Sequence, residues 1–308
     1  MICDCCPRHC HAERNETSGH GYCGQGVLPK IARAGLHHWE EPCISGERGS
    51  GAVFFTGCTL GCVYCQNDAI SHHGQGKVIS EERLISIFEE LVEQGANNIN
   101  LVSPTPYVDV LERVLRRAKP PVPVVYNTSG YETPETLRRL EGLVDIYLPD
   151  LKYCSPELSQ RYSGAANYFE IASRAVLEMC RQTGLPQFDA NGLLRSGTLV
   201  RHLILPGQAE ESKRVLHWIR DNLPKGTPVS VMAQYLPCGK AADYPEINRR
   251  IAKSEYNAVL DELFALDLDG YVQERSSAKK DYIPPFDLSG VEQAETPRPS
   301  SFRAGAEQ

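Results

Sequence analysis

Three cysteines on one short loop are the residues best suited to chemistry. Cys58, Cys62 and Cys65 lie within the run from Gly57 to Asn67, directly after the apolar residues 53–55. A tight loop that supplies three thiolates can hold a cubane iron–sulfur cluster and leave one iron open to another ligand. Structural zinc, which takes four closed ligands, and buried free cysteines are the alternatives. The spacing favours the cluster.

A second set of cysteines lies near the start of the chain. Four thiols in a segment rich in Cys, His and Gly can close a site for structural zinc or for a second [4Fe-4S] cluster, and the spacing does not separate these alternatives. Loop thiols without a metal are the third interpretation. The four residues are Cys3, Cys6, Cys10 and Cys23. Cys43 stands alone, and a buried small residue is a better interpretation of it than a hydrogen donor.

The composition sets the context for these cysteines. Nine of the twelve cysteines lie before residue 66, and the chain begins without the basic and apolar stretches of a secretory signal. We therefore expect a cytoplasmic protein whose cysteines serve metal binding or catalysis rather than disulfides. The net charge of −7, without a cluster of basic residues, argues against a nucleic-acid partner. No apolar run is long enough to predict a membrane span.

Strand and helix patterns alternate after residue 50, which predicts an α/β fold, a partial (β/α)6 barrel of the TIM type. The expected strands are 52–56, 98–103, 123–127, 144–148, 199–205 and 229–235. The expected helices are 81–94, 108–118, 134–140, 168–183, 210–222 and 245–266. In such barrels the functional side chains follow the carboxyl ends of the strands.

The chain divides into three parts by composition. Residues 1–50 are predicted to form a Cys-rich, metal-binding appendage, and residues 51–275 the barrel. Residues 276–308 form a C-terminal extension that ends in a tail rich in Pro, Ser, Glu and Ala. Such a composition predicts disorder for most of this tail.

The Cys-x3-Cys-x2-Cys spacing, with an aromatic residue before the last cysteine, resembles the signature of the radical S-adenosylmethionine (SAM) superfamily. Further stretches, at 99–106, 126–131 and 147–152, are similar to the pyruvate formate-lyase activating enzymes, and most of all to the PflX-like group. The resemblance implies a [4Fe-4S] cluster and SAM as cofactors, with flavodoxin or ferredoxin as electron donor. It implies cleavage of SAM to a 5'-deoxyadenosyl radical, which abstracts hydrogen from a glycyl-radical protein or from a small molecule. A scaffold or electron-transfer protein that never cleaves SAM is the alternative from another class.

The resemblance also implies which residues contact the cofactors. Polar groups that follow the strands would meet SAM, with Asp150 and Lys152 near its carboxylate and a monovalent cation. The full expected set is Tyr64, Asn67, Ser103, Thr105, Asn127, Ser129, Asp150, Lys152 and Arg201. The chain departs from the family in two places. The stretch 103–106 lacks the usual Glu, and the stretch 232–238 lacks a His, for which Gln234 and Tyr235 are the candidate substitutes.

Overall fold

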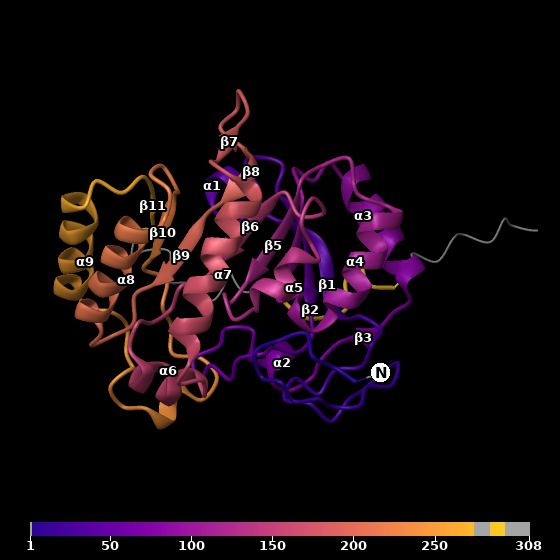
Figure 1. The fold of residues 1–308 in the computed structure, drawn as a ribbon, viewed down its shortest axis with the longest axis horizontal. Helices are drawn as coiled ribbons and strands as arrows, with labels where there is room; N and C mark the ends of the chain where they lie inside the picture. The colour runs from indigo at the N-terminus through magenta and orange to yellow at the C-terminus, as the bar shows by residue number, and fades with distance from the viewer. Residues whose placement is uncertain (1, 274–283, 293–308) are drawn as a thin grey trace, which may run out of the picture.

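An arc of parallel strands forms the centre of the molecule (Figure 1). The computed structural model describes residues 2–273 and 284–292. Strands β2 (Ser50–Phe55), β4 (Ile99–Val102), β5 (Val124–Thr128) and β6 (Ile146–Pro149) pair in chain order. A single parallel bridge between Asp150 and Arg201 then joins β6 to β9 (Val200–Leu203), which pairs with β10 (Val229–Met232). All six predicted strands are therefore present, in the predicted order.

The remaining strands lie at the margins of this arc. Strand β8 (Leu194–Thr198) pairs with β6 and, antiparallel, with β7 (Gln187–Phe188), while β11 (Gly270–Val272) pairs with β10. Strands β3 (Lys77–Val78) and β11 end the two described sheets at opposite edges, so the described strands form an open arc rather than a closed barrel.

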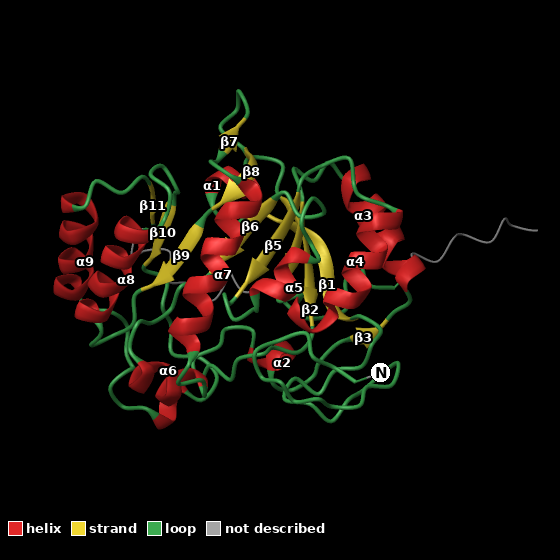
Figure 2. Cartoon of the chain, in the orientation of Figure 1, coloured by secondary structure: helices red, strands yellow, loops and turns green. Residues whose placement is uncertain are grey.

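Helices that follow the strands cover the outer face of the arc (Figure 2). They are α3 (Glu81–Glu93), α4 (Val108–Arg117), α5 (Pro134–Arg138), α7 (Tyr168–Thr183), α8 (Ala209–Asn222) and α9 (Lys253–Ala265). Helix α3 buries Leu84, Ile87, Phe88 and Leu91 on one face, as its 3.6-residue periodicity predicts. Shorter elements are α1 (Pro42–Ser45), α2 (Asp68–Ser71), α6 (Pro156–Ser163), η1 (Thr105–Tyr107) and η2 (Ala241–Asp243).

Helix α9 begins at Lys253, eight residues later than the predicted start at Pro245. The Glu255 carboxylate accepts a hydrogen bond from the backbone N–H of Ala252 at 2.6 Å. It also pairs with Arg249. This cap satisfies a free N–H at the first turn and fixes the start of the helix there.

The sheet begins inside the segment that the sequence assigns to the appendage. Strand β1 (Lys30–His37) pairs antiparallel with β2 along its length and also with β3. It was missed because small residues, Ala32, Ala34 and Gly35, weaken the β-strand pattern that its neighbours Ile31 and Leu36 would otherwise show. The irregular part of the N-terminal segment is therefore residues 2–29.

Part of the predicted C-terminal extension packs on the edge of the sheet. The N–H of Leu288 donates to the Ala32 carbonyl at 3.0 Å, and the Ser289 carbonyl accepts from the Ala34 N–H at 2.9 Å. The Phe286 ring packs against Phe54. Residues 284–292 thus extend the barrel wall beside β1, while 276–283 and 293–308, including the tail predicted to be disordered, lie outside the described residues.

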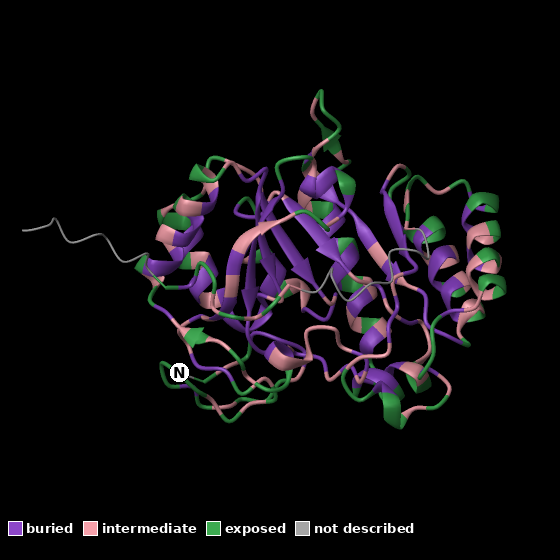
Figure 3. Cartoon of the chain, turned by 180° about the vertical axis from the view of Figure 1, so that it is seen from behind, coloured by how far each residue is buried: buried purple, intermediate pink, exposed green. Residues whose placement is uncertain are grey.

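The strands are the most buried part of the chain, as Figure 3 shows from the opposite side. All the residues of β2, β4, β5 and β10 are buried. Loops of the N-terminal segment and α2 gather beyond the end of β2, at the lower side of Figure 1. Among the described residues, no helix has the length and apolar character needed to cross a membrane.

Candidate cofactor site

The three-cysteine loop lies at the carboxyl end of β2, as the sequence predicts. Cys58, Cys62 and Cys65, in the loop between β2 and α2, all line one cavity of about 230 Å³. Gly57 opens the loop with φ of +90°, a conformation that L side chains rarely adopt, and a Cβ there would overlap the Gln25 side chain. The loop geometry therefore requires glycine at this position.

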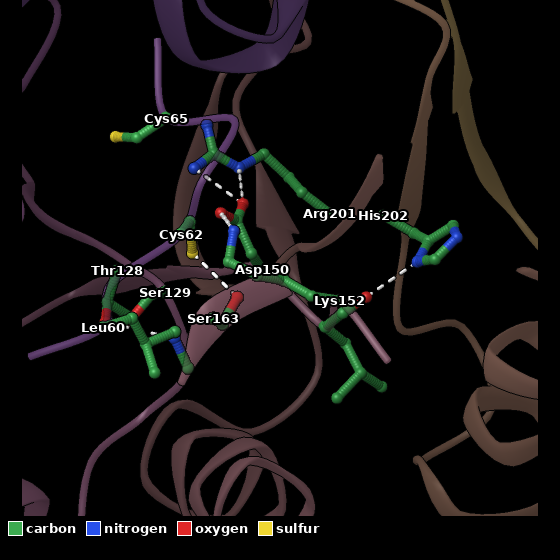
Figure 4. A network of polar contacts seen from close by, with 12 residues as sticks. Leu60, Cys62, Cys65, Thr128, Ser129, Asp150, Lys152, Ser163, Arg201 and His202 are labelled. Carbon is green, nitrogen blue, oxygen red and sulfur yellow. Dashed lines mark hydrogen bonds and ion pairs between the residues drawn. The ribbon is translucent and has the colours of Figure 1, made fainter. Parts of the chain in front are cut away.

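The α6 end holds the cysteine loop from the other side. The backbone N–H of Gly61 donates to the Ser163 carbonyl at 3.2 Å, and that of Val63 donates to the Tyr162 carbonyl at 2.9 Å. The Cys62 Sγ lies 3.0 Å from the Ser163 hydroxyl, which can donate to it (Figure 4). Hydrogen bonds of this kind orient a sulfur ligand and tune the metal that it binds.

The chemistry of this donor set fits an iron–sulfur cluster. Three thiols without a fourth on the same loop leave one iron of a cubane open. Burial raises the pKa of both Cys58 and Cys65 to about 12, so these thiols are protonated without metal, and cluster binding must displace their protons. Lys152 opposes this rise at both residues and so favours the thiolates.

A charged network forms the opposite wall of the cavity (Figure 4). Arg201 at the start of β9 donates from Nε to Asp150 Oδ1 at 3.0 Å, and from Nη2 to Asn127 Oδ1 at 2.6 Å. Its Nη1 lies 3.2 Å from Glu40 Oε2. Lys152 Nζ lies 2.6 Å from Asp150 Oδ2. Two cations and two carboxylates thus connect residues at β5, β6 and β9 with the segment before β2.

Asp150 is the centre of this network. Its burial disfavours the charged form, but Arg201 and Lys152 outweigh that cost and lower the pKa of its carboxyl. Burial likewise opposes the charge on Lys152, while Asp150 and then Cys62 raise its pKa. Asp150 and Lys152 are therefore both ionised at neutral pH, and Lys152 places a positive charge near Cys62.

The structure brings most of the expected cofactor residues together with the cysteines. Ser103, at the end of β4, has φ of +58°, an uncommon backbone conformation for a non-glycine residue that often marks a functional site. The expected residues that line the cavity are Tyr64, Asn67, Ser103, Asn127, Ser129, Asp150, Lys152 and Arg201. Gln234 lines it as well.

Two expected residues lie elsewhere. The Thr105 hydroxyl donates to Glu132 Oε1 at 2.7 Å in the interior, and Thr105 does not line the cavity. Tyr235 is buried, and its hydroxyl donates to the Ile247 carbonyl at 2.9 Å. Cys43 packs in a hydrophobic cluster with Ile44 and is 2% exposed.

Sequence reasoning missed several residues of the site. Glu40 and Trp39 line the cavity from the segment before β2, and Glu40 bonds to Arg201 and Asn127. Ser163 reaches Cys62 from α6. None of these residues follows a barrel strand, so the expectation that functional side chains follow the strand ends does not include them. The paired carboxylates of Glu40 and Glu41, next to Pro42, were the one available signal.

The N-terminal cysteines also come together. Cys3, Cys6, Cys10 and Cys23 line a second cavity, together with Cys5. Within the described residues, no three Cys, His, Asp or Glu side chains converge on a point that would suit a single metal ion. The three cysteines of the loop do not converge on one point either. A cubane cluster does not require that they do, because each thiolate binds a different iron.

Comparison with known proteins identifies the family. Residues 52–219 match the model of the Radical SAM superfamily. The chain belongs to this superfamily. It is also 31% identical over 277 residues to the uncharacterized protein MJ0674 of Methanocaldococcus jannaschii, a match that covers 86% of this chain and 76% of that one.

Several solved structures resemble this one at low sequence identity. A domain of pyruvate-formate lyase-activating enzyme from Bacteroides vulgatus is 13% identical, with a TM-score of 0.39, and the match covers 56% of this chain and 91% of that one. Streptococcus suis SuiB bound to SAM is 13% identical, with a TM-score of 0.48, covering 71% and 48%. The hydrogenase maturase HydG from Carboxydothermus hydrogenoformans is 15% identical, with a TM-score of 0.47, covering 70% and 56%. These likenesses assign no role to any residue here.

A radical SAM enzyme uses a [4Fe-4S] cluster and SAM, and the cavity supplies residues for both. When bound, these cofactors supply a 5'-deoxyadenosyl radical after transfer of one electron. Cys58, Cys62 and Cys65 would hold the cluster. Lys152 would place a cation beside it for the SAM carboxylate, and Asn127 and Ser129 would offer short polar groups. Asp150 positions Lys152 and does not itself act as an acid, because its low pKa keeps it ionised.

Proposed function

We propose that this radical SAM enzyme abstracts hydrogen from a glycyl-radical protein, as an activating enzyme does. One observation carries the proposal: the cofactor cavity continues into an outer groove. Trp39, Glu40 and Gln234 line both the cofactor cavity and this outer groove, which has a volume of about 420 Å³. The outer groove is further lined by Tyr271 and Val272 of β11.

The outer groove offers surface suited to an extended backbone. Trp39 is 58% exposed and Val272 is 38% exposed, so an aromatic and an aliphatic side chain lie open beside the cavity mouth. These two side chains give the backbone of a partner apolar surface to pack against. A glycine-containing loop is thin enough to reach from this surface to the cofactors, since glycine lets a backbone approach closely.

The electron for SAM cleavage would come from flavodoxin or ferredoxin, which are one-electron donors of low potential. The similarity of residues 147–152 to the activating enzymes supports the choice of substrate. Residues 232–238, however, lack the His of the activating enzymes. Because of this difference, hydrogen abstraction from a small molecule is the competing hypothesis.

The first experiment tests SAM cleavage. After anaerobic reconstitution with iron and sulfide, the protein with dithionite and SAM should release 5'-deoxyadenosine. Replacement of Cys58, Cys62 or Cys65 by Ala should remove both the cluster absorbance and the product, because each thiolate holds a different iron. Cys43→Ala is the matched control and should retain both, since Cys43 packs in a hydrophobic cluster. Product from any of the three loop variants would contradict the assignment.

The second experiment tests the substrate. Candidate glycyl-radical proteins are incubated with the reduced enzyme and SAM, and electron paramagnetic resonance (EPR) measures the doublet of a glycyl radical. The matched control is the same partner with its radical glycine replaced by alanine. Release of 5'-deoxyadenosine without a partner radical, for every such protein of the source organism, would overturn the activating role and direct the search to small molecules.

A further inference from the structure

The N-terminal cysteines form a second cavity that the proposed function does not use. Five of them, Cys3, Cys5, Cys6, Cys10 and Cys23, line it. The Arg14 guanidinium also lines this cavity and donates from Nη1 to Cys3 Sγ at 3.5 Å. The backbone N–H of Tyr22 donates to Cys10 Sγ at 3.3 Å. Contacts of this kind orient sulfur ligands for a metal.

Contacts with the barrel fix this cavity in place. The Thr136 hydroxyl at α5 donates to the Cys5 carbonyl at 3.1 Å, and Cys5 Sγ lies 3.8 Å from the Thr105 carbonyl. Cys5 is 5% exposed, and its Sγ also lies 3.5 Å from Cys3 Sγ. The other four cysteines keep the Cys-x2-Cys-x3-Cys-x12-Cys spacing that closes a four-thiolate site.

The second cavity lies directly against the cluster loop. Thr59 lines the cavity of the N-terminal cysteines, while its neighbour Cys58 lines the cofactor cavity. Consecutive Cα atoms are about 3.8 Å apart, so the wall between the two cavities is one residue thick at this point.

Side chains of the N-terminal segment also clamp this wall. The Arg8 Nε donates to the Thr59 carbonyl at 2.8 Å, and its Nη1 donates to the Gly164 carbonyl at 2.7 Å. The Tyr22 hydroxyl lies so close to Gly61 that a Cβ there would overlap it. The Arg8 guanidinium stacks 3.9 Å from the centre of the Tyr22 ring. A redox group in the cavity of the N-terminal cysteines would therefore lie beside the loop whose cysteines hold the SAM-site cluster.

We propose that Cys3, Cys6, Cys10 and Cys23 hold a second iron–sulfur cluster through which electrons enter the SAM site. A low-potential one-electron donor would reduce this cluster, and the cluster would return to its oxidised form by giving the same electron to the SAM site. One electron then leaves the donor for each SAM cleaved to methionine and 5'-deoxyadenosyl radical. The relay rests on SAM cleavage by this enzyme, but not on the identity of the substrate.

Metal content tests the site independently of SAM cleavage. The variant with Cys58, Cys62 and Cys65 all replaced by Ala cannot hold the first cluster. After anaerobic reconstitution it should retain about four irons with acid-labile sulfide per chain. Further replacement of Cys10 by Ser should remove that iron, while Cys154→Ser, which changes a cysteine that lines neither cavity, should leave it unchanged. About one zinc per chain, or no metal, in the triple variant would overturn the proposal.

Spectroscopy and kinetics test the relay. With the barrel cysteines intact, the reduced protein should show two interacting cluster signals by EPR, and Cys10→Ser should leave one unbroadened signal. That variant should also release 5'-deoxyadenosine at least tenfold more slowly with reduced flavodoxin as donor, while far-ultraviolet circular dichroism and SAM affinity match the wild type. If the second cluster is lost and the flavodoxin-driven rate is unchanged, the relay is refuted. A Cys5→Ser variant should behave as wild type; loss of the cluster there would overturn the assigned ligands.

Discussion

Arg201 offers the sharpest test of the charged wall. We expect Arg201→Ala to destabilise the metal-free protein strongly, because the guanidinium bonds to Asp150, Glu40 and Asn127 at once. The side chains of Arg201, Asp150 and Glu40 are only 14%, 18% and 11% exposed. Its removal leaves the Asp150 and Glu40 carboxylates without their shared cation, and Lys152 remains as the one cation of the network.

The expected magnitude follows from burial. Breaking a buried pair by removing one partner costs about 3–5 kcal/mol, chiefly because an uncompensated charge stays inside. The entropy of unfolding is about 2.1 cal/mol/K per residue, which for 308 residues gives about 0.65 kcal/mol/K. The melting temperature should therefore fall by about 5–8 °C.

The assay is thermal unfolding of the metal-free protein under anaerobic conditions, followed by circular dichroism. Arg195→Ala is the matched control, because Arg195 also forms a two-nitrogen pair with a carboxylate, Asp189, but is 41% exposed. An exposed pair contributes at most about 1 kcal/mol, so the control should lose less than about 2 °C. Equal losses in the two variants would refute the argument that burial makes the Arg201 network stabilising.

Three further predictions concern other residues of the site. Lys152→Ala should weaken SAM binding, measured by equilibrium dialysis, by about tenfold or more while the cluster absorbance persists, because it removes the cation expected to pair with the SAM carboxylate; unchanged affinity would exclude Lys152 from binding. Gly61→Ala should destabilise the protein by about 1–3 kcal/mol in denaturant unfolding, and Tyr22→Phe in the same chain should restore most of it, because only the hydroxyl obstructs the new Cβ and the ring carbon Cζ lies at 3.6 Å. Burial raises the pKa of Glu41 from 4.5 to about 7, so Glu41 should lower stability as the pH rises from 4.5 to 7, and Glu41→Gln should lose less stability than the wild type over that range; parallel stability curves for the two proteins would contradict it.

The sequence predicts the barrel well because its signals are local. Each predicted strand is a short β-branched run, and α3 carries an apolar stripe that its own residues define. The cysteine loop is equally local, since three ligands stand within eight residues. The rule that functional side chains lie at the carboxyl ends of parallel strands then places Asn127 and Asp150 in one cavity, as observed, whereas Arg201 lies at the start of β9.

The parts that the sequence does not predict depend on contacts between distant segments. Glu40 bonds to Arg201, 161 residues later, and nothing near either residue indicates the other. Thr105 follows a strand as the rule requires, yet its hydroxyl turns inward to the buried Glu132, which no local pattern reveals. Side-chain direction at a strand end is therefore set by partners elsewhere in the chain.

The N-terminal segment belongs to the site more closely than its composition suggests. Glu40 completes the charged wall, while Arg8 and Tyr22 hold the cysteine loop from outside. The segment thus contacts both walls of the cofactor cavity before the first parallel strand begins. Because Arg8 and Tyr22 hold the loop through contacts of the protein itself, replacement of Cys10 should leave the occupancy of the SAM cluster unchanged.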